Sequence, residues 1–196
     1  MPTLYDNKHS RNGFKIRLLA KHLGLQLDRV EVDIVAGESR TADFLTKNVA
    51  GRIPVLQLED GSVMAESNAI LFYLAAGTAL LPSDPRGQAE TLRWMFYEQN
   101  MVECSIGTAR FWKKLGRDRD RPDAFAHRME MAIDALSTLD RHFADHQWAA
   151  LGRLTIADIA LYAYVSVSDE AGIDMSDFPN VTAWMGRVVS ETGAAA

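Results

Sequence analysis

The sequence of 196 residues contains only one cysteine, Cys104, and this scarcity excludes several kinds of site. A lone cysteine cannot form an intramolecular disulfide, a CxxC redox motif or a cysteine-based zinc site. The fold must therefore be held by packing, for which a chain that is 47% hydrophobic and 24% charged has an ordinary globular composition. We expect Cys104 to be a small buried residue within a helix, with a position lining a pocket as the alternative.

The sequence also lacks long apolar runs and concentrated positive charge. The segment 156–167 is among the most apolar, but it contains Asp158 and is far shorter than the roughly 20 residues of a membrane span. The N-terminus shows no basic region followed by an apolar one, so we expect no signal peptide. A formal net charge of -5 argues against nucleic-acid binding. We expect a soluble cytoplasmic protein with neither nucleic-acid nor membrane partners.

The first 80 residues alternate between strand-like and helix-like segments. An Asp60-Gly61 pair separates the last two strand-like segments, as in a hairpin. The predicted order is βαβαββα. Apolar periodicity places the strands at 3–5, 29–34, 54–58 and 62–65, and the helices at 11–23, 41–47 and 66–76.

The remainder of the chain is predicted to be all-helical. The stretch "LLPSDPRG", with two prolines, is the best linker candidate. In "LTIAD", Thr155 and Asp158 form a variant of the capping box that starts a helix. The predicted helices are 88–114, 124–145, 155–170 and 181–191. We therefore predict an α+β chain with an N-terminal domain at 1–78, a linker at 79–86 and an all-α domain at 87–196.

Three short stretches are candidates for function. The segment "KHSRN", Lys8 to Asn12, breaks the chain between the first strand and helix, and is either a solvated corner or a chemical site. In "RIPVLQL", Pro54 stands at the entry of a strand. In "ESNAI", Glu66 and Ser67 begin a helix, where free backbone N–H groups attract an anion, although Glu66 alone is also an ordinary first-turn residue.

Together these stretches resemble the glutathione transferase family over almost the whole chain. The signs are "RIPVL" before the third strand, "ESNAI" at the third helix and "LTIADIALYAY" in the helical half. The segment "LLPSDPRGQAETLRWMFYEQN" is similar to the linker and fourth helix of bacterial members. The resemblance implies a thioredoxin-like N-terminal domain that binds glutathione, a helical domain that supplies most of an apolar second-substrate pocket, and a homodimer.

The resemblance also implies how glutathione is held. Pro54 would be cis, and the N–H and C=O of Ile53 would pair with the cysteinyl part of glutathione as an added strand does. Ser67 would receive the γ-glutamyl carboxylate and Glu66 the ammonium group. Arg52 is the nearest cation for the glycyl carboxylate, with Lys15 and Arg11 as alternatives.

The same resemblance points to the residue that meets the glutathione sulfur, which is a tyrosine, serine or cysteine in different members. Ser10, seven residues before Arg17, is similar to the serine-type, zeta-like pattern, although zeta-like members continue with a second serine and a cysteine. Tyr5 is the alternative, but its ring is expected to pack in the sheet. Asn12 would either support Ser10, donate to sulfur itself, or only cap the helix.

A Ser-His pair of His9 with Ser10 is disfavoured, because adjacent turn residues seldom face each other. We therefore expect a glutathione transferase that joins the glutathione thiolate to a small hydrophobic electrophile. A glutathione-dependent peroxidase, etherase, dehalogenase or isomerase of the same fold is the first alternative. A non-catalytic protein-interaction module is the second.

Overall fold

The computed structural model describes residues 1–194, and the chain divides into two compact units, Met1–Ala76 and Gly77–Ala196. The first unit has the predicted βαβαββα order. A short 3-10 turn, η1 (Glu38–Arg40), precedes its second helix. The elements are β1 (Thr3–Asp6), α1 (Arg11–Leu23), β2 (Asp28–Glu31), α2 (Ala42–Lys47), β3 (Val55–Gln57), β4 (Val63–Ala65) and α3 (Ser67–Leu74).

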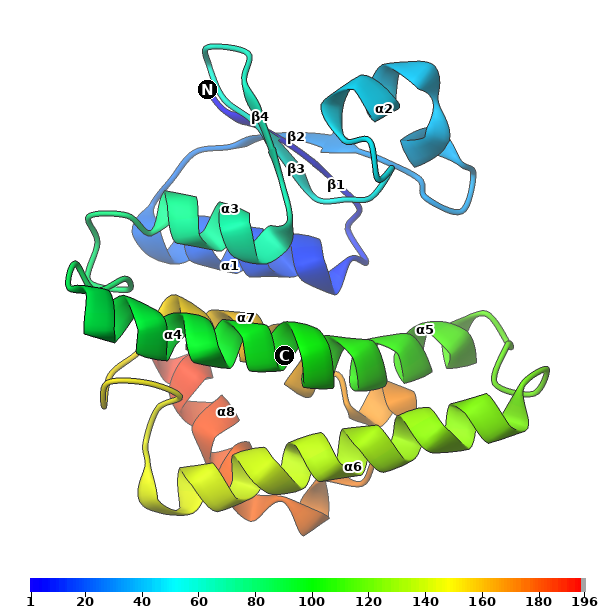
Figure 1. The fold of residues 1–196 in the computed structure, drawn as a ribbon, viewed down its shortest axis with the longest axis vertical. Helices are drawn as coiled ribbons and strands as arrows, with labels where there is room; N and C mark the ends of the chain where they lie inside the picture. Colours follow the sequence, from blue (N-terminus) through cyan, green and yellow to red (C-terminus); the bar gives the residue numbers. More distant parts are fainter. Residues whose placement is uncertain (195–196) are drawn as a thin grey trace. The chain divides into compact units, whose positions relative to one another are not determined.

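The four strands form one mixed sheet in the order β2-β1-β3-β4. β1 is parallel to β2 and antiparallel to β3, and β3 is antiparallel to β4. Helices α1 and α3 lie side by side on one face, and α2 lies on the other side (Figure 1). Fully buried side chains such as Leu4, Ile16 and Ile70 belong to the core. A smaller cluster of Val32, Phe44 and Val55 joins α2 to the sheet.

The register brings three chain segments to one end of the sheet. Tyr5 is paired with Val55 across β1 and β3, and Val55 is paired with Ala65 across β3 and β4. The turn after β1, the segment that enters β3 and the start of α3 therefore meet there. The Ile53-Pro54 peptide bond in the second of these segments is cis, as the resemblance implied.

The second unit is helical throughout its described residues, 77–194. The predicted helix 88–114 is one rod of three consecutive parts, running beside α6 (Figure 1). Its middle part, η2, is a π-helix, a form that is rare over such a length. The elements are α4 (Pro85–Tyr97), η2 (Glu98–Gly107), α5 (Thr108–Lys114), α6 (Pro122–Asp145), α7 (Ile156–Val165), η3 (Asp169–Ala171), η4 (Met175–Asp177) and α8 (Pro179–Thr192).

The predicted capping box at the start of α7 is present. Asp158 Oδ2 accepts from the Thr155 N–H at 2.9 Å, and Thr155 Oγ1 accepts from the Ala157 N–H at 3.3 Å. Asp158 Oδ1 also accepts from Ala149 N–H at 2.8 Å and Trp184 Nε1 at 3.0 Å. This buried carboxylate therefore joins the start of α7 to α8 and to the segment before it.

Two expectations for the helical half were wrong. Cys104 is exposed on η2 rather than buried, because its position on the rod turns it away from the packed face. The helix expected to run to Glu170 ends at Val165, and a short 3-10 turn follows. No helix within residues 1–194 has the length and apolarity needed to cross a bilayer.

Candidate functional site

Ser10 is the N-cap of α1, and this position fixes its hydroxyl group. The Ser10 Oγ accepts a hydrogen bond from the Gly13 N–H at 3.1 Å, and the backbone is extended at φ -70° and ψ 125°. Within residues 1–194 the hydroxyl hydrogen has no acceptor. Ser10 is half-buried, so its hydroxyl can donate to a ligand while it caps the helix.

Asn12 and Ser67 join the starts of α1 and α3. The Ser67 hydroxyl donates to Asn12 Oδ1 at 3.0 Å and accepts from Lys15 Nζ at 3.3 Å. Lys15 Nζ also donates to Asn68 Oδ1 at 3.2 Å, and the Lys15 side chain is completely buried. Lys15 was an alternative cation for a glycyl carboxylate, but the structure places its ammonium group at the α3 start instead. The predicted residues Asn12 and Ser67 are thus in direct contact.

Glu66 has an unusual backbone at the entrance to α3. Its φ of 69° and ψ of 113° lie in a region that residues with a side chain rarely adopt. Such a conformation costs of order 1–3 kcal/mol and persists where the surroundings hold it, most often at a functional site. The Glu66 side chain is exposed beside the N-terminus of α3. Glu66 and Ser67 together therefore present a carboxylate and a helix N-terminus at the same place.

The segment before β3 supplies Arg52, Ile53 and Pro54. The Ile53 side chain packs against the Val55 cluster, while its N–H and C=O have no partner within residues 1–194. An extended ligand can pair with these two groups. Arg52 is exposed, and its carbonyl accepts from Asn48 Nδ2 at 2.8 Å, which fixes the backbone and leaves the side chain directed to solvent.

An ion pair between a buried carboxylate and a partly buried arginine at the Ser10 turn was not foreseen. Asp6 at the end of β1 is paired with Arg17 of α1, and Arg29 Nη2 lies 3.7 Å from the same carboxylate. Burial raises the pKa of Asp6 despite the two cations, and burial likewise lowers the pKa of Arg17. The sequence carried a signal for this pair, namely an aspartate ending an apolar strand and an arginine in an apolar helix face.

Tyr5 and His9 make contacts that do not involve the Ser10 hydroxyl. The Tyr5 ring packs edge-on against Phe44 at a centroid distance of 6.3 Å, and its hydroxyl donates to Gln57 Oε1 at 3.0 Å. The Tyr5 side chain therefore packs in the sheet, as expected. His9 is exposed, and its N–H donates to Asn7 Oδ1 at 3.0 Å. No cluster of three or more His, Cys, Asp or Glu suited to a metal occurs in the described part of the chain.

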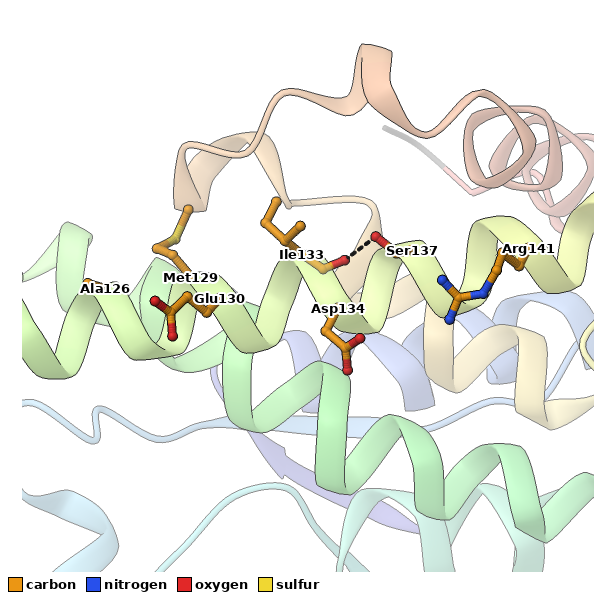
Figure 2. Close-up of a pocket in the computed structure, with 7 residues that line it drawn as sticks. All are labelled: Ala126, Met129, Glu130, Ile133, Asp134, Ser137 and Arg141. Carbon is orange, nitrogen blue, oxygen red and sulfur yellow. Dashed lines mark hydrogen bonds between the residues drawn. The ribbon is translucent and has the colours of Figure 1, made fainter.

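Two surface hollows lie on the helical unit. Figure 2 shows the first, about 690 Å³, whose lining residues all project from α6. The second, about 580 Å³, is lined by residues of α4 and η2, including Phe96, Tyr97 and Cys104. Tyr97 joins the two helices, because its hydroxyl donates to the Ala135 carbonyl of α6 at 3.2 Å. Neither hollow contains any of the predicted site residues.

Comparison with known proteins gives consistent matches along the chain. A solved structure from Rhodopseudomonas palustris, described as a possible glutathione S-transferase, is 43% identical, with a TM-score of 0.95 and coverage of 100% of this chain and 89% of that one. Glutathione S-transferase D7 of Anopheles gambiae is 29% identical, covering 97% of this chain and 87% of that protein. Protein URE2 of Candida glabrata is 29% identical over 93% of this chain, which spans only 63% of that longer protein.

Two family profiles match the two units. The profile for the glutathione S-transferase N-terminal domain covers residues 2–76, and the profile for the glutathione S-transferase C-terminal domain covers residues 100–191. Together they account for well over half of the sequence. The chain therefore belongs to the glutathione S-transferase family.

Proposed function

We propose that this protein is a glutathione transferase that binds glutathione on its N-terminal unit and presents the sulfur as a thiolate to an electrophile. The hydrogen bond between Asn12 and Ser67 carries the proposal. It joins the helix start that holds Ser10 to the helix start that holds Glu66. One tripeptide can therefore place its sulfur at the first and its γ-glutamyl group at the second.

The remaining contacts follow from the chemistry of glutathione. The γ-glutamyl carboxylate suits the α3 N-terminus at Ser67, and buried Lys15 adds positive charge behind it. The ammonium group suits Glu66. The cysteinyl backbone pairs with the N–H and C=O of Ile53, next to cis Pro54. Arg52, exposed beside this segment, suits the glycyl carboxylate.

The Ser10 hydroxyl stabilises the thiolate by donating a hydrogen bond to it. A hydrogen bond to a charged group contributes about 1.5–3 kcal/mol, which lowers a thiol pKa by roughly one to two units. A thiol with an ordinary pKa near 8.5 then loses its proton to solvent at neutral pH. The thiolate electron pair forms a carbon–sulfur bond with the electrophile, and the bond from that carbon to the leaving group breaks, so that the leaving group departs with the electron pair of this bond. Ser10 keeps its proton throughout.

We also propose a second substrate and a partner subunit. The second substrate is a small hydrophobic electrophile, as expected of this family. The active form is a homodimer that covers exposed apolar side chains of the α4–α6 face, chiefly Phe96 at 69% exposure and Ile133 at 42%. Burying such surface is favourable at about 25 cal/mol per Å².

The decisive experiment measures glutathione binding and thiol ionisation together. The wild-type chain should be retained on immobilised glutathione, show ultraviolet thiolate absorbance at neutral pH and conjugate a chloronitrobenzene. Ser10→Ala should lose most of the thiolate signal while still binding glutathione. A wild-type chain that neither binds glutathione nor ionises it contradicts the proposal. Binding without conjugation of any electrophile tested would favour the non-catalytic interaction module instead.

A further inference from the structure

A single arginine, Arg17, holds the turn that carries Ser10. Arg17 is ion-paired with buried Asp6, whose side chain is 1% exposed. Its Nη2 also donates to the carbonyls of Lys8 and Ser10, each at 3.3 Å, and its Nη1 to that of Asn7 at 3.4 Å. A guanidinium group is planar and carries five donors in fixed directions. One side chain therefore fixes the end of β1 and residues 7–10 relative to α1.

At Gly13, helix α1 comes very close to the Asp6 carboxylate of this ion pair. A Cβ atom at Gly13 would lie 1.7 Å from Asp6 Oδ1, so only glycine permits the first turn of α1 to rest on the carboxylate. The Gly13 N–H is also the group that the Ser10 hydroxyl caps. Gly13 thus connects the Asp6 carboxylate to the Ser10 hydroxyl at the start of α1.

A gain in the free energy of unfolding is a weak explanation for the pairing of Asp6 with Arg17. Desolvating two charges costs free energy that their attraction often fails to recover, so a buried ion pair is poor evidence of a stabilising role. Asp6 Oδ1 moreover has no hydrogen-bond partner within residues 1–194. Arg29, the second cation beside Asp6, is 43% exposed and bonds to none of the carbonyls that Arg17 holds. The carbonyl contacts are specific to Arg17.

We propose that Asp6 and Arg17 are positioning residues that hold the Ser10 turn in the geometry needed to stabilise the glutathione thiolate. This inference rests on the proposed function. Neither residue touches the substrate: Arg17 holds the turn through its carbonyls, and Asp6 holds Arg17 and supports Gly13. If the turn relaxes, Ser10 can still cap α1, but its hydroxyl no longer meets the sulfur at the right distance.

The test compares Arg17→Lys with Arg29→Gln in the full chain. Lysine keeps a positive charge beside Asp6 but cannot span the three carbonyls. We expect Arg17→Lys to raise the pKa of the bound glutathione thiol by about one unit, so that kcat/KM falls about tenfold at mildly acidic pH. The loss should vanish at alkaline pH, where the thiol ionises unaided, and KM for glutathione should change little. Arg29→Gln should leave the thiol pKa unchanged.

A second variant, Asp6→Asn, tests the same role if Arg17→Lys fails to fold. Asp6→Asn keeps the side-chain volume and leaves Arg17 in place, but an amide holds the guanidinium less firmly, so the thiol pKa should rise in the same direction. If Arg17→Lys and Asp6→Asn both leave the bound thiol pKa at the wild-type value, or only lower activity equally at every pH, the positioning role is wrong. A wild-type protein that does not bind glutathione refutes instead the proposed function.

Discussion

The Ser10 hydroxyl has two separate tasks at one position. Its oxygen caps α1 through Gly13, and its hydrogen is left for a ligand. Ser10→Ala should therefore lower the free energy of unfolding by about 1 kcal/mol and raise the bound thiol pKa by roughly one to two units. Denaturant unfolding and thiolate absorbance measure the two effects.

A matched control separates the two tasks of Ser10. Asp84 caps α4 by accepting from the Gly87 N–H at 2.8 Å. Asp84→Ala should cost a similar amount of stability and leave the thiol pKa unchanged. If both variants change the thiol equally, the effect of Ser10 is one of stability alone.

Glu66 combines backbone strain with a proposed ligand contact. Glycine tolerates positive φ, so Glu66→Gly should stabilise the fold by about 1 kcal/mol while weakening retention on immobilised glutathione. Leu151 has φ 56° in the second unit and is 44% exposed. Leu151→Gly should therefore relieve strain without affecting retention. Equal retention by both variants would remove Glu66 from the site.

Residue patterns located the break at Lys8 to Asn12 and the helix start at Ser67, and the family resemblance selected Ser10 within that break, but neither revealed the charges beneath them. Ser10, Asn12 and Ser67 stand at helix starts, where a single sequence shows them. The pairing of Asp6 with Arg17 depends on how β1 and α1 close over each other, and the sequence does not encode that distance locally. The burial of Lys15 against Ser67 was not predicted for the same reason, because it requires α3 to lie beside α1.

Apolar periodicity predicted the order of strands and helices in the N-terminal unit and most of the helix bounds. It could not predict η2, because the spacing of apolar residues indicates a helix but does not tell whether its hydrogen bonds run from i to i+4 or from i to i+5. The end of α7 was misplaced because Val167 and Ala171 stay buried beyond Val165 and continue the apolar pattern, although the backbone there forms a turn and then the 3-10 helix η3.

The start of α7 depends on one buried carboxylate with several donors. Asp158→Asn would turn an NH₂ group toward N–H donors from Ala149, Thr155 or Trp184. An unsatisfied buried donor costs about 1–3 kcal/mol, so the free energy of unfolding should fall by about that much. Asp174, an exposed cap that accepts from the Ser176 N–H at 2.9 Å, provides the control. Asp174→Asn should have almost no effect in the same denaturant titration.

His142 of α6 lies against Trp94 of α4, with a distance of 4.4 Å between the ring centroids. His142 stacks on His146 at a centroid distance of 4.3 Å, and burial lowers its pKa from the ordinary value near 6.5. Below that value the unfolded chain binds more protons, so stability from neutral His142 is lost as the pH falls toward the folded-state pKa. His142→Gln should therefore flatten the decline of unfolding free energy on acidification.

Exposed His127 is the control for this pH effect, since its side chain is 69% exposed. His127→Gln should retain the wild-type decline. Unfolding titrations at neutral and mildly acidic pH compare the three proteins. An unchanged slope in His142→Gln would show that other groups cause the acid sensitivity.

The helical unit exposes large apolar side chains to solvent, and burying them against a partner is favourable. Phe96 borders a hollow on α4 and η2, and Ile133 borders the hollow on α6 shown in Figure 2. Tyr97 links these helices through its hydrogen bond to the Ala135 carbonyl. A second copy of the chain is the proposed cover.

Phe96→Glu should disrupt that association, because a glutamate buried in an apolar interface must lose its hydration without gaining a partner. Sedimentation should give about twice the 21.8 kDa chain mass for the wild-type protein and a mass near that of one chain for the variant. Leu115→Glu places the same charge on another exposed apolar residue, 39% exposed after α5, and should remain dimeric. A wild-type monomer, or a Phe96→Glu dimer as stable as the wild type, would exclude this face as the interface. Because the predicted glutathione contacts all come from residues of the N-terminal unit, the monomeric variant should still be retained on immobilised glutathione.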